Sequence, residues 1–586
     1  MKWLRVAIVV GLVILGARAA DLQILRTKQY QTLAAGQMRQ TITLPAVRGG
    51  IYDRNGAVLA MSVPTKMVIA NNFQIDHPAD EAKALAPILG MQASALEPML
   101  RRHSGYVVLT KYLDASKADK ISRNHFPGIT MVDTAQRTTP NGALASSVIG
   151  LTNADGKGAA GLEYQYQQLL AGTSGSETLL QTPYGVALPQ GGALKTKPAV
   201  AGRGIELTLD QPLQYVTEQA LASQIKATNA LSGTAIVMNT RTGQILSMAN
   251  LVSTTSTDPN VASPLASQNP SGIEGIAQAQ NNLAVTQTYL PGSVFKVVPF
   301  MGALDAGTIK ADSPFSVPSQ IEIGGHVFHD AEEHGAMSMT ATQILEQSSN
   351  LGTYLISNQL GESNLLAAVQ RLGFGQSTGL NFPGESAGLL MNAARWQSTD
   401  IASLPIGQVD ATTPMQMLDA YNAVANNGVF VNPSIIRAIQ GADGQLQEVP
   451  PTASRRAMSE STAATLRKMF EGVVTQGTGG KAAISGYNVA GKTGTAAIPS
   501  NDHLSFVSGA YNASFIGFAP SDNPVLTAIV VLQRPTSPSY FGGDTAAPVF
   551  AKIMSYALHR YGIPTSPDGG AAQAASAAQN SSREIT

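Results

Sequence analysis

The chain contains no cysteine, which excludes disulfide bridges, thiolate catalysis and cysteine-ligated zinc sites. Charged residues are also scarce, at 13% of the chain, and Lys plus Arg balance Asp plus Glu at 38 each. A neutral chain lacks the basic surplus with which proteins bind nucleic-acid phosphates. The eight histidines show no metal-ligand spacing, and HVFHD at 326–330 is better interpreted as a polar hairpin. The composition therefore indicates neither a nucleic-acid partner nor a metal site.

The most hydrophobic segment lies at the amino terminus. An uninterrupted apolar run at 6–17 follows the basic residues Lys2 and Arg5. It is either the core of a secretory signal peptide, with ARA at 17–19 as cleavage site, or a membrane span from 3 to 25. In both cases the basic residues keep the amino end in the cytoplasm and the rest of the chain is exported.

The remaining chain divides into three segments. Residues 26–200 are mixed in composition and end in an unpatterned linker rich in Gly, Pro and Lys at 187–204. Residues 201–563 form a second segment that is long enough for a core of its own. The last residues, 564–586, are a low-complexity tail that we expect to be disordered.

The second segment has the pattern of an α+β domain. Strand-like runs at 205–210, 233–249 and 512–533 flank a stretch, 293–475, in which helical patterns dominate. Asp210 is expected to cap the helix that follows the first strand. This order predicts one antiparallel sheet with a helical portion inserted.

A lysine within an apolar helix is the first chemical signal. Lys296 lies in YLPGSVFKVV at 289–298, and burying an ammonium costs several kcal/mol unless it is paired or deprotonated. Pro291-Gly292 place Ser293 near the start of this helix, where unpaired N–H groups favour negative charge. Residues three apart share a helix face, so a neutral Lys296 amine can act as base toward the Ser293 hydroxyl.

The Ser-x-x-Lys pattern alone is weak. A second copy, Ser223 to Lys226, lies on the polar side of the expected helix after Asp210, where a solvated face explains it. The first copy therefore needs support from elsewhere in the chain.

Two further motifs follow in order. Ser348-Ser349-Asn350 interrupts a helical stretch and has the plainer interpretation of a helix cap. Ser-x-Asn also occurs at 267–269 and 521–523, both in loop or turn sequence.

The third motif is the only Lys-Thr-Gly in the chain, within AGKTGTAAI at 490–498. Gly494 between Thr493 and Thr495 indicates a strand that another backbone approaches closely. Lys492 is suited to receive a carboxylate, although an ordinary solvated strand lysine gives the same pattern.

The ordered set Ser-x-x-Lys, Ser-x-Asn, Lys-Thr-Gly is the signature of penicillin-binding proteins and serine β-lactamases. The chain resembles the class B penicillin-binding proteins, which are monofunctional peptidoglycan transpeptidases, over nearly its full length. RGGIYDRNGAVLA at 48–60 resembles the motif of their amino-terminal pedestal, and GFGQSTGLNFPGE, VVTQGTGGKA and FIGFAP are similar to other family stretches. The ending YFGGDTAAPVFAKIM is most similar to the division-type, or septal, subgroup.

The resemblance implies a fold and a location. We expect a transmembrane anchor at 1–25, an elongated pedestal of the dimerisation type at 26–200 and a transpeptidase domain at 201–563. That domain would hold a central antiparallel sheet and an all-helical subdomain. The anchor is then better interpreted as uncleaved, in the cytoplasmic (inner) membrane with its amino end inside the cell. Whether it is cleaved stays open on the residues alone.

The resemblance also assigns catalytic roles. Ser293 would attack the penultimate D-Ala carbonyl of a D-Ala-D-Ala stem peptide, and Lys296 would take the serine proton. Ser348 would pass a proton toward the leaving D-Ala, while Asn350 holds the peptide and the lysine. No metal or organic cofactor is needed.

Substrate-binding roles follow for the third motif. Lys492 and Thr493 would bind the terminal carboxylate, with Gly494 beside them and help from the Thr495 hydroxyl. The backbone N–H groups of Ser293 and Thr495 would form the oxyanion hole. An amine from a neighbouring stem peptide would then close the crosslink. Family members are acylated by β-lactam antibiotics and work with a SEDS-family glycan polymerase and other division proteins.

Several alternatives stay open. An elongation-type transpeptidase, a D,D-carboxypeptidase and a serine β-lactamase all share the three motifs, and an inactive division scaffold would need none of them. The chain is much longer than a β-lactamase requires, and intact Ser293, Lys296 and Lys492 argue against a scaffold. One departure is Leu290, where many family members carry an acidic or aromatic residue.

Overall fold

The computed structural model describes residues 2–28, 30, 39–180, 193–255, 272–500 and 505–568. Of the tail predicted to be disordered at 564–586, residues 564–568 are described and are held by unit 2: Ser566 is buried, its N–H donates to the Gly486 carbonyl at 2.9 Å, and its hydroxyl accepts from Asn488 N at 2.9 Å. The rest of the predicted tail, from 569 onward, lies outside the described residues. The described chain is mixed α and β, which confirms the predicted fold class. It separates into two compact units. Unit 1 comprises residues 1–49, 61–138 and 168–203, and unit 2 comprises 50–60, 139–167 and 204–586.

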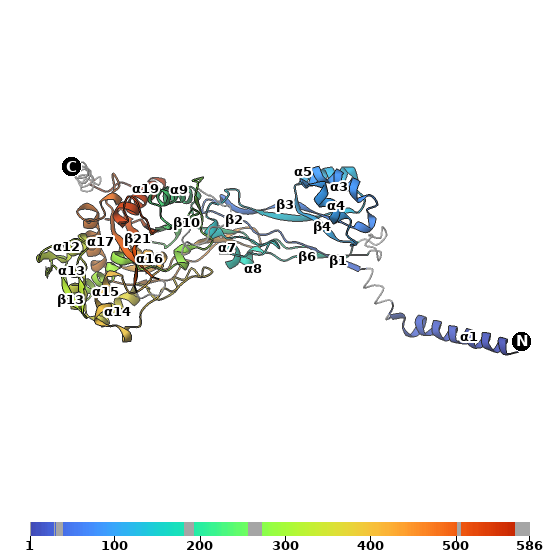
Figure 1. Ribbon diagram of the computed structural model, residues 1–586, viewed down its shortest axis with the longest axis horizontal. Coiled ribbons are helices and arrows are strands. Elements are labelled where there is room, and N and C mark those ends of the chain that lie inside the picture. The colour runs from blue at the N-terminus through green and yellow to red at the C-terminus, as the bar shows by residue number, and fades with distance from the viewer. Residues whose placement is uncertain are drawn as a thin grey trace. The chain divides into compact units, whose positions relative to one another are not determined.

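Unit 1 begins with the apolar helix α1 (Lys2–Ala20), which continues into a π-helical turn (Asp21–Leu25) (Figure 1). No residue of α1 is buried, and the span Lys2–Ile24 is long and apolar enough to cross a membrane. Asp21 pairs with Arg18 at 2.6 Å and with Arg26 at 3.1 Å. These three charges lie at the carboxyl end of the apolar segment, and Lys2 and Arg5 lie at its amino end.

The rest of unit 1 contains two antiparallel sheets and a helical cluster. The first sheet has the order β1 (Arg39–Leu44), β6 (Gly175–Leu180), β7 (Ala193–Lys197). In the second, the unit 1 part of β3 (Val58–Ala70) lies between β4 (Val107–Leu113) and β5 (Ile129–Thr138). Three helices share a core with this sheet: α3 (Pro78–Leu89), α4 (Ala93–Leu100) and α5 (Ala115–Asn124). Pro78 at the first turn and left-handed Gly90 after the last turn set the ends of α3.

Unit 2 is organised around a six-stranded antiparallel sheet. Its order is β11 (Ile276–Gln278), β10 (Ile245–Ser253), β9 (Ser232–Asn239), β22 (Leu526–Gln533), β21 (Phe506–Ala519), β20 (Ala490–Pro499). The central strands are buried along nearly their whole length, so both faces of the sheet are covered. The strand patterns at 233–249 and 512–533 are confirmed in this sheet as β9, β10, β21 and β22. The run at 205–210 is predicted in the same sheet, but it forms β8 (Ile205–Leu207) in a separate sheet, where it pairs in parallel with β2 (Ile51–Tyr52).

Two helices that are far apart in the sequence share one core with this sheet: α9 (Gln211–Thr228) and α19 (Ala547–Arg560) (Figure 1). The side chain of Asp210 accepts a hydrogen bond from Leu213 N at 3.1 Å, which confirms the predicted cap of α9. The same carboxylate binds Arg560 at 2.7 Å. An ion pair thereby connects the start of α9 to the end of α19.

The inserted residues are largely helical. They form α10 (Leu283–Thr286), a 3₁₀ turn (Gly292–Lys296), α11 (Val297–Asp305), α12 (Ala341–Glu346), α13 (Asn350–Leu360), α14 (Glu362–Arg371), α15 (Ser398–Ser403), α16 (Pro414–Ala425) and α17 (Glu460–Thr475). Short 3₁₀ turns lie at Asn72–Gln74 in unit 1 and at Ala393–Arg395, Leu404–Ile406 and Gly480–Ala482 in unit 2. Helix α16 is buried along its entire length and packs on strands β21 and β22.

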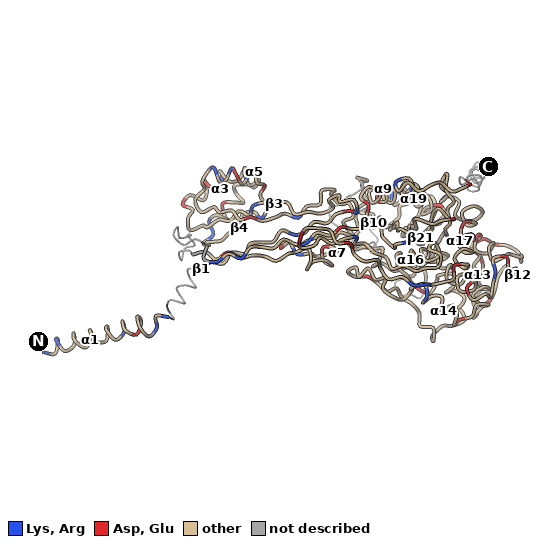
Figure 2. The backbone as a smooth tube through the Cα atoms, turned by 180° about the vertical axis from the view of Figure 1, so that it is seen from behind, with Lys and Arg blue, Asp and Glu red and all other residues tan. Residues whose placement is uncertain are grey.

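Smaller elements complete unit 2. Short antiparallel pairs are β12 (Pro314–Val317) with β15 (Met337–Thr340), β13 (Ile321–Ile323) with β14 (His326–Phe328), and β16 (Val429–Val431) with β19 (Ser454–Arg456). A further sheet joins β18 (Leu446–Glu448), β17 (Ile436–Gln440), β8 (Ile205–Leu207), β2 (Ile51–Tyr52) and the first residues of β3. The short helices are α6 (Ser146–Ile149), α7 (Gly161–Gln165), α8 (Gln167–Leu170, shared between the units) and α18 (Gly542–Thr545). Basic and acidic residues are interspersed in both units (Figure 2), in keeping with their equal numbers.

Candidate active site

The first motif lies on a tight turn ahead of α11. Residues 292–296 form a 3₁₀ helix rather than the start of a regular α-helix, and Gly292 adopts a left-handed φ of +61°. A side chain at Gly292 would meet the Ala496 Cβ at 2.9 Å. The turn therefore packs directly on strand β20, which carries the third motif, and the absence of a side chain permits that approach.

Lys296 is fully buried at the end of this turn. Its Nζ donates to the Ser348 carbonyl at 2.5 Å and to Asn350 Oδ1 at 2.9 Å, and lies 3.2 Å from Ser348 Oγ. Burial above all, and then the charge of Lys492, lower the pKa of Lys296 well below its ordinary value, while Asp330 opposes this. The lysine is therefore held by the second motif in a place that favours a neutral amine.

Ser293 is only partly buried, at the exposed side of the same turn. Among the contacts of the described residues, no hydrogen bond joins its hydroxyl to Lys296, whose amine faces Ser348 and Asn350 instead. Hydrogen bonds between catalytic groups are often long in the absence of substrate. The first and second motifs nevertheless meet at a single amine.

The second motif is held in a strained backbone conformation. Ser348 has a φ of +58°, a region that costs a residue with a Cβ about 1–2 kcal/mol. Ser349 caps α13, because its hydroxyl accepts from Gly352 N at 2.9 Å. The cap sets the strained residue at the helix entrance, with its hydroxyl toward Lys296.

Asp330 organises this motif, and the sequence patterns do not single it out. Its carboxylate accepts from Asn350 N at 2.5 Å, from Leu351 N at 2.9 Å and from the Ser349 hydroxyl at 2.6 Å. His334 Nε2 lies 2.9 Å from it. Although burial opposes the charge, these hydrogen bonds hold the pKa of Asp330 below its ordinary value. A carboxylate thus fixes the first turn of α13.

Asp330 belongs to HVFHD, and the first part of that stretch is the polar hairpin that the sequence predicts, β13 with β14. The signal for a functional residue is weak, because the hairpin and the helix that Asp330 caps are separated by residues with no shared pattern. Only the path of the chain after the hairpin brings its carboxylate under α13.

The third motif lies on β20 beside the turn of the first. An ideal Cβ on Gly494 would lie 3.0 Å from the Pro291 carbonyl and 3.1 Å from Val294 Cγ1. The backbone that lies close to this glycine is therefore that of the serine turn. A larger residue at Gly494 would push the two motifs apart.

Lys492 is fully buried, and burial lowers its pKa to about 7. Its Nζ lies 3.3 Å from the Thr493 carbonyl and 3.4 Å from Thr493 Oγ1. Thr493 Oγ1 is 2.6 Å from the Thr478 hydroxyl, and Thr495 Oγ1 accepts from Gly542 N at 3.1 Å. A buried amine next to a threonine hydroxyl is suited to bind a carboxylate, which would favour the positively charged form of the amine.

An exposed aromatic cluster lies beside this strand, and the sequence reasoning missed it as well. Tyr511 and Tyr540 stack with ring centroids 4.5 Å apart, and Phe541 lies 4.4 Å from Tyr540. Phe541 immediately precedes Gly542, whose N–H binds Thr495, and is 49% exposed. The cluster adds an apolar surface beside strand β20, which carries Lys492, Thr493 and Thr495.

The decoy copies of the motifs have ordinary structural explanations where they are described. Ser223 and Lys226 are exposed on α9, and the Ser223 hydroxyl donates to its own helix at Gln219 O. The Ser521 hydroxyl donates to Glu471 at 2.7 Å. The copy at 267–269 lies outside the described residues.

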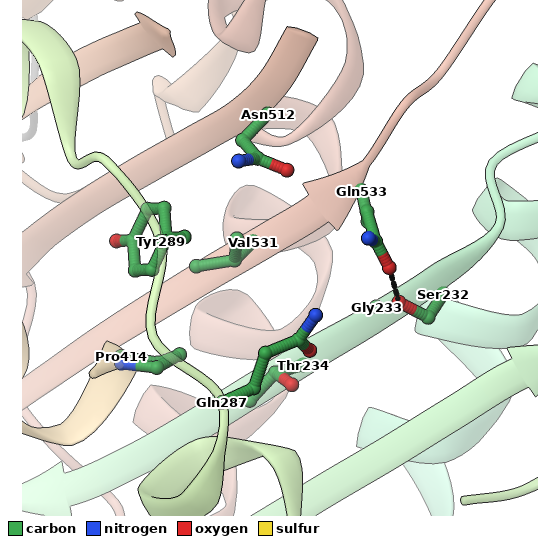
Figure 3. Close-up of a pocket in the computed structure, with 9 residues that line it drawn as sticks. All are labelled: Ser232, Gly233, Thr234, Gln287, Tyr289, Pro414, Asn512, Val531 and Gln533. Atoms are coloured by element: carbon green, nitrogen blue, oxygen red, sulfur yellow. Dashed lines mark hydrogen bonds between the residues drawn. The ribbon is translucent and has the colours of Figure 1, made fainter. Parts of the chain in front are cut away.

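A small hollow lies beneath the segment that leads to the serine turn (Figure 3). Tyr289, Gln287 and residues of β9 and β22 line it, and the Gln533 side chain accepts from the Ser232 hydroxyl at 2.7 Å. Its volume of about 20 Å³ is enough for roughly one water molecule. It is therefore too small to be the substrate site.

Comparisons with known proteins agree with this arrangement. The profile of the penicillin binding protein transpeptidase domain matches residues 233–555, and that of the penicillin-binding protein dimerisation domain matches residues 43–207. The chain is a class B penicillin-binding protein. The resemblance inferred from its motifs is thereby confirmed.

Relatives of this penicillin-binding protein align over almost all of it. Penicillin-binding protein PbpB of Mycobacterium tuberculosis is 33% identical over 577 residues, covering 94% of this chain and 83% of the relative. The peptidoglycan D,D-transpeptidase FtsI of Escherichia coli is 29% identical, covering 95% and 91%. The crystal structure of penicillin binding protein 3 from M. tuberculosis, complexed with ampicillin, has a TM-score of 0.69 at 30% identity, covering 90% and 98%.

Proposed function

We propose that this chain is a peptidoglycan D,D-transpeptidase that crosslinks stem peptides during septal wall synthesis. The observation that carries the proposal is the environment of Lys296: a buried amine of lowered pKa, three residues after a serine, bound to Ser348 and Asn350. Its relatives include proteins named for the same activity, and FtsI is among them.

Acylation begins at Ser293. The Lys296 amine takes the hydroxyl proton as Ser293 Oγ attacks the carbonyl carbon between the two D-Ala residues. The backbone N–H groups of Ser293 and Thr495 bind the oxyanion of the tetrahedral intermediate. Ser348, whose Oγ is 3.2 Å from the lysine amine, relays a proton to the leaving D-Ala nitrogen, and the peptide bond breaks.

Lys492, Thr493 and Thr495 hold the terminal carboxylate of the donor peptide. The charge of this carboxylate stabilises the protonated form of Lys492, whose pKa is about 7 without it. Gly494 allows this strand to lie against the serine turn. An amine from a second stem peptide then attacks the acyl-enzyme ester, releases Ser293 and forms the crosslink.

Partners and location follow the same proposal. β-Lactam antibiotics would acylate Ser293 in place of the stem peptide. Helix α1 would anchor the protein as a single span in the cytoplasmic (inner) membrane, with its amino end in the cytoplasm and the chain after it on the extracytoplasmic side. Unit 1 would provide the pedestal that contacts a SEDS-family glycan polymerase and other division proteins. No metal or organic cofactor takes part in these steps.

The first experiment is the mass of the intact protein after exposure to benzylpenicillin. We expect one long-lived penicilloyl adduct in the wild type, none in Ser293→Ala, and an unchanged adduct in Ser223→Ala, which changes the decoy copy. An adduct that decays within seconds would indicate a β-lactamase. A folded wild type that forms no adduct would contradict the proposal and favour the inactive scaffold.

A second experiment separates transpeptidation from hydrolysis. The acylated enzyme is formed from a pentapeptide ending in D-Ala-D-Ala and is offered an acceptor stem peptide. A crosslinked dimer is the expected product. A tetrapeptide that forms at the same rate with and without acceptor would identify a D,D-carboxypeptidase instead.

A further inference from the structure

A second cavity lies in the helical portion of unit 2 and shares no residue with the active site described above. Its volume is about 240 Å³. It lies between helix α16, the turn that follows α14, and the β16–β19 pair. The residues that line it and carry the argument are Gln416, Asp419, Thr378, Phe430, Asn432 and Arg455.

Asp419 is the unusual member of this lining. It is only 2% exposed, and neither carboxylate oxygen has a hydrogen-bond partner among the described residues. Its neighbour Gln416 cannot supply one. That amide already donates to Gln376 O at 2.9 Å and to Ala387 O at 2.8 Å, and it accepts from Thr413 N at 2.9 Å. A buried carboxyl group without a partner is costly, so Asp419 lacks a structural explanation within its own helix.

A second carboxylate, that of Glu385, affects the pKa of Asp419. Glu385 accepts from Thr378 N at 2.7 Å and from the Thr378 hydroxyl at 2.5 Å, while its other oxygen has no partner in the described chain. Burial first, and then the charge of Glu385, raise the pKa of Asp419 well above its ordinary value. A positive group next to Asp419 would stabilise its charged form against both burial and the charge of Glu385.

The exposed side of the cavity carries the opposite charge. The Arg455 guanidinium stacks on the Phe430 ring at 4.3 Å and donates one N–H to Arg371 O at 2.5 Å. Arg455 lines the cavity and is exposed, so it lies at the solvent-accessible end of the lining. A planar guanidinium fixed by a ring and a carbonyl is preorganised to receive a carboxylate.

From the unpartnered carboxyl group at the buried end and the fixed guanidinium at the exposed end, we propose that this cavity binds a small zwitterionic amino acid. The ammonium group sits on Asp419, and the carboxylate sits on Arg455. A cavity of about 150 Å³ accommodates benzene, so this one has room for a somewhat larger molecule. A metal ion fits less well, because the described residues contain no group of three His, Asp or Glu side chains able to hold one.

The proposal is tested by isothermal titration calorimetry of the detergent-solubilised full chain with D-alanine and with L-alanine. The protein is first acylated with benzylpenicillin, so that the active site is filled and heat arises elsewhere; unacylated protein is titrated in parallel. If acylation itself fails, the proposed function is in doubt while the unacylated titration still tests the cavity.

We expect saturable binding of at least one enantiomer. Propylamine, which lacks the carboxylate, and N-acetylalanine, which lacks the ammonium group, should each bind at least about tenfold more weakly, as removal of one charged hydrogen-bond partner predicts. Asp419→Asn, which preserves the side-chain shape, should weaken binding by a similar factor. Arg455→Gln should do so from the exposed end, and Asp522→Asn, a change at an exposed aspartate, should leave binding unchanged.

Two outcomes would overturn the proposal. Absence of saturable heat with both enantiomers would mean that the cavity holds water only. Equal binding by the wild type, Asp419→Asn and Arg455→Gln would place the amino acid elsewhere. Should Asp419→Asn fail to fold, shown by its thermal unfolding without ligand, Arg455→Gln still decides the question because its side chain is exposed.

Discussion

Replacing Asp330 by Asn should slow acylation of Ser293 without unfolding the protein. The carboxylate accepts two backbone N–H groups on one oxygen, and the Ser349 hydroxyl and His334 lie on the other. An amide keeps one acceptor oxygen and the shape, but it loses the charge and the second acceptor. Ser349 would then no longer be held in place at the entrance of α13.

The size of the effect follows from the bonds that are lost. A hydrogen bond to a charged group contributes about 1.5–3 kcal/mol. Loss of one such bond from the arrangement that positions Ser348 and Asn350 corresponds to a reduction of about 10- to 150-fold in acylation rate. Some of this cost is shared with stability, so the melting temperature of the variant should also fall.

The assay is the second-order rate of acylation by a fluorescent penicillin across a range of pH, with Asp312→Asn at an exposed position as the control. Loss of the charge of Asp330 and loss of its positioning role change the pH profile of acylation in different ways. Asp330 raises the pKa of Lys296, so loss of its charge alone would move the rise of the rate to lower pH and leave the high-pH plateau unchanged. Loss of positioning lowers the plateau itself. A wild-type plateau in Asp330→Asn would refute the role assigned to this carboxylate.

Three other predictions follow from buried groups and close contacts. Burial raises the pKa of Glu218 from 4.5 to about 7, so the folded state keeps a proton that the unfolded state releases as the pH rises. Between pH 4.5 and 8, the free energy of unfolding should therefore fall by about 3 kcal/mol more in the wild type than in Glu218→Gln. Urea titrations that give the same pH dependence for both proteins would contradict this. Lys492 lowers the pKa of Lys296, so Lys492→Met should move the rise of the acylation rate with penicillin to higher pH, whereas a shift to lower pH would show that the two amines do not interact as described. Gly494→Ala places a methyl group against a hydroxyl of the adjacent strand and against the serine turn, and should reduce the acylation rate at least about tenfold. Gly335→Ala is the control, because no atom lies within 4 Å of the added methyl group. Equal acylation rates in Gly494→Ala and the wild type would show that the strand does not need to lie so close to the turn.

The sequence predicted the reacting groups because their signals are local. Lys296 lies in an apolar run three residues after Ser293, so hydropathy and spacing alone identify this pair as a candidate. The cap at Asp210 and the strand patterns of the main sheet are local as well, and the structure confirms them. The apolar amino-terminal run forms the helix that its composition predicts.

The structure differs from the expectation in one local detail. Ser293 lies on a 3₁₀ turn, and the Lys296 amine faces Ser348 and Asn350 rather than the Ser293 hydroxyl. Spacing on a helix says which residues share a face, but not where a long flexible side chain finds its acceptors. Those acceptors come from α13, a helix that begins far along the chain.

The residues that the sequence reasoning missed act only across long separations. Asp330 caps a helix that begins about twenty residues later in the chain, beyond β15 and α12, and no capping pattern in the sequence links the two. The aromatic cluster of Tyr511, Tyr540 and Phe541 forms because the segment after β22 folds back on β21. Asp419 lies within a helix whose pattern is that of a core element, and only the cavity beside it distinguishes it from any other helix residue.

The sequence by itself thus determined which chemistry we propose for this protein, because Ser-x-x-Lys in an apolar run and a Lys-Thr-Gly strand are recognisable from residue type and immediate neighbours. The tertiary structure decided the pKa values of these groups and the directions of their side chains. The lowered pKa values of Lys296 and Lys492 depend on burial by distant elements, and the orientation of Ser348 depends on the Asp330 carboxylate beneath α13. Burial and electrostatic coupling are properties of three-dimensional distance, which the spacing of residues along a chain does not specify.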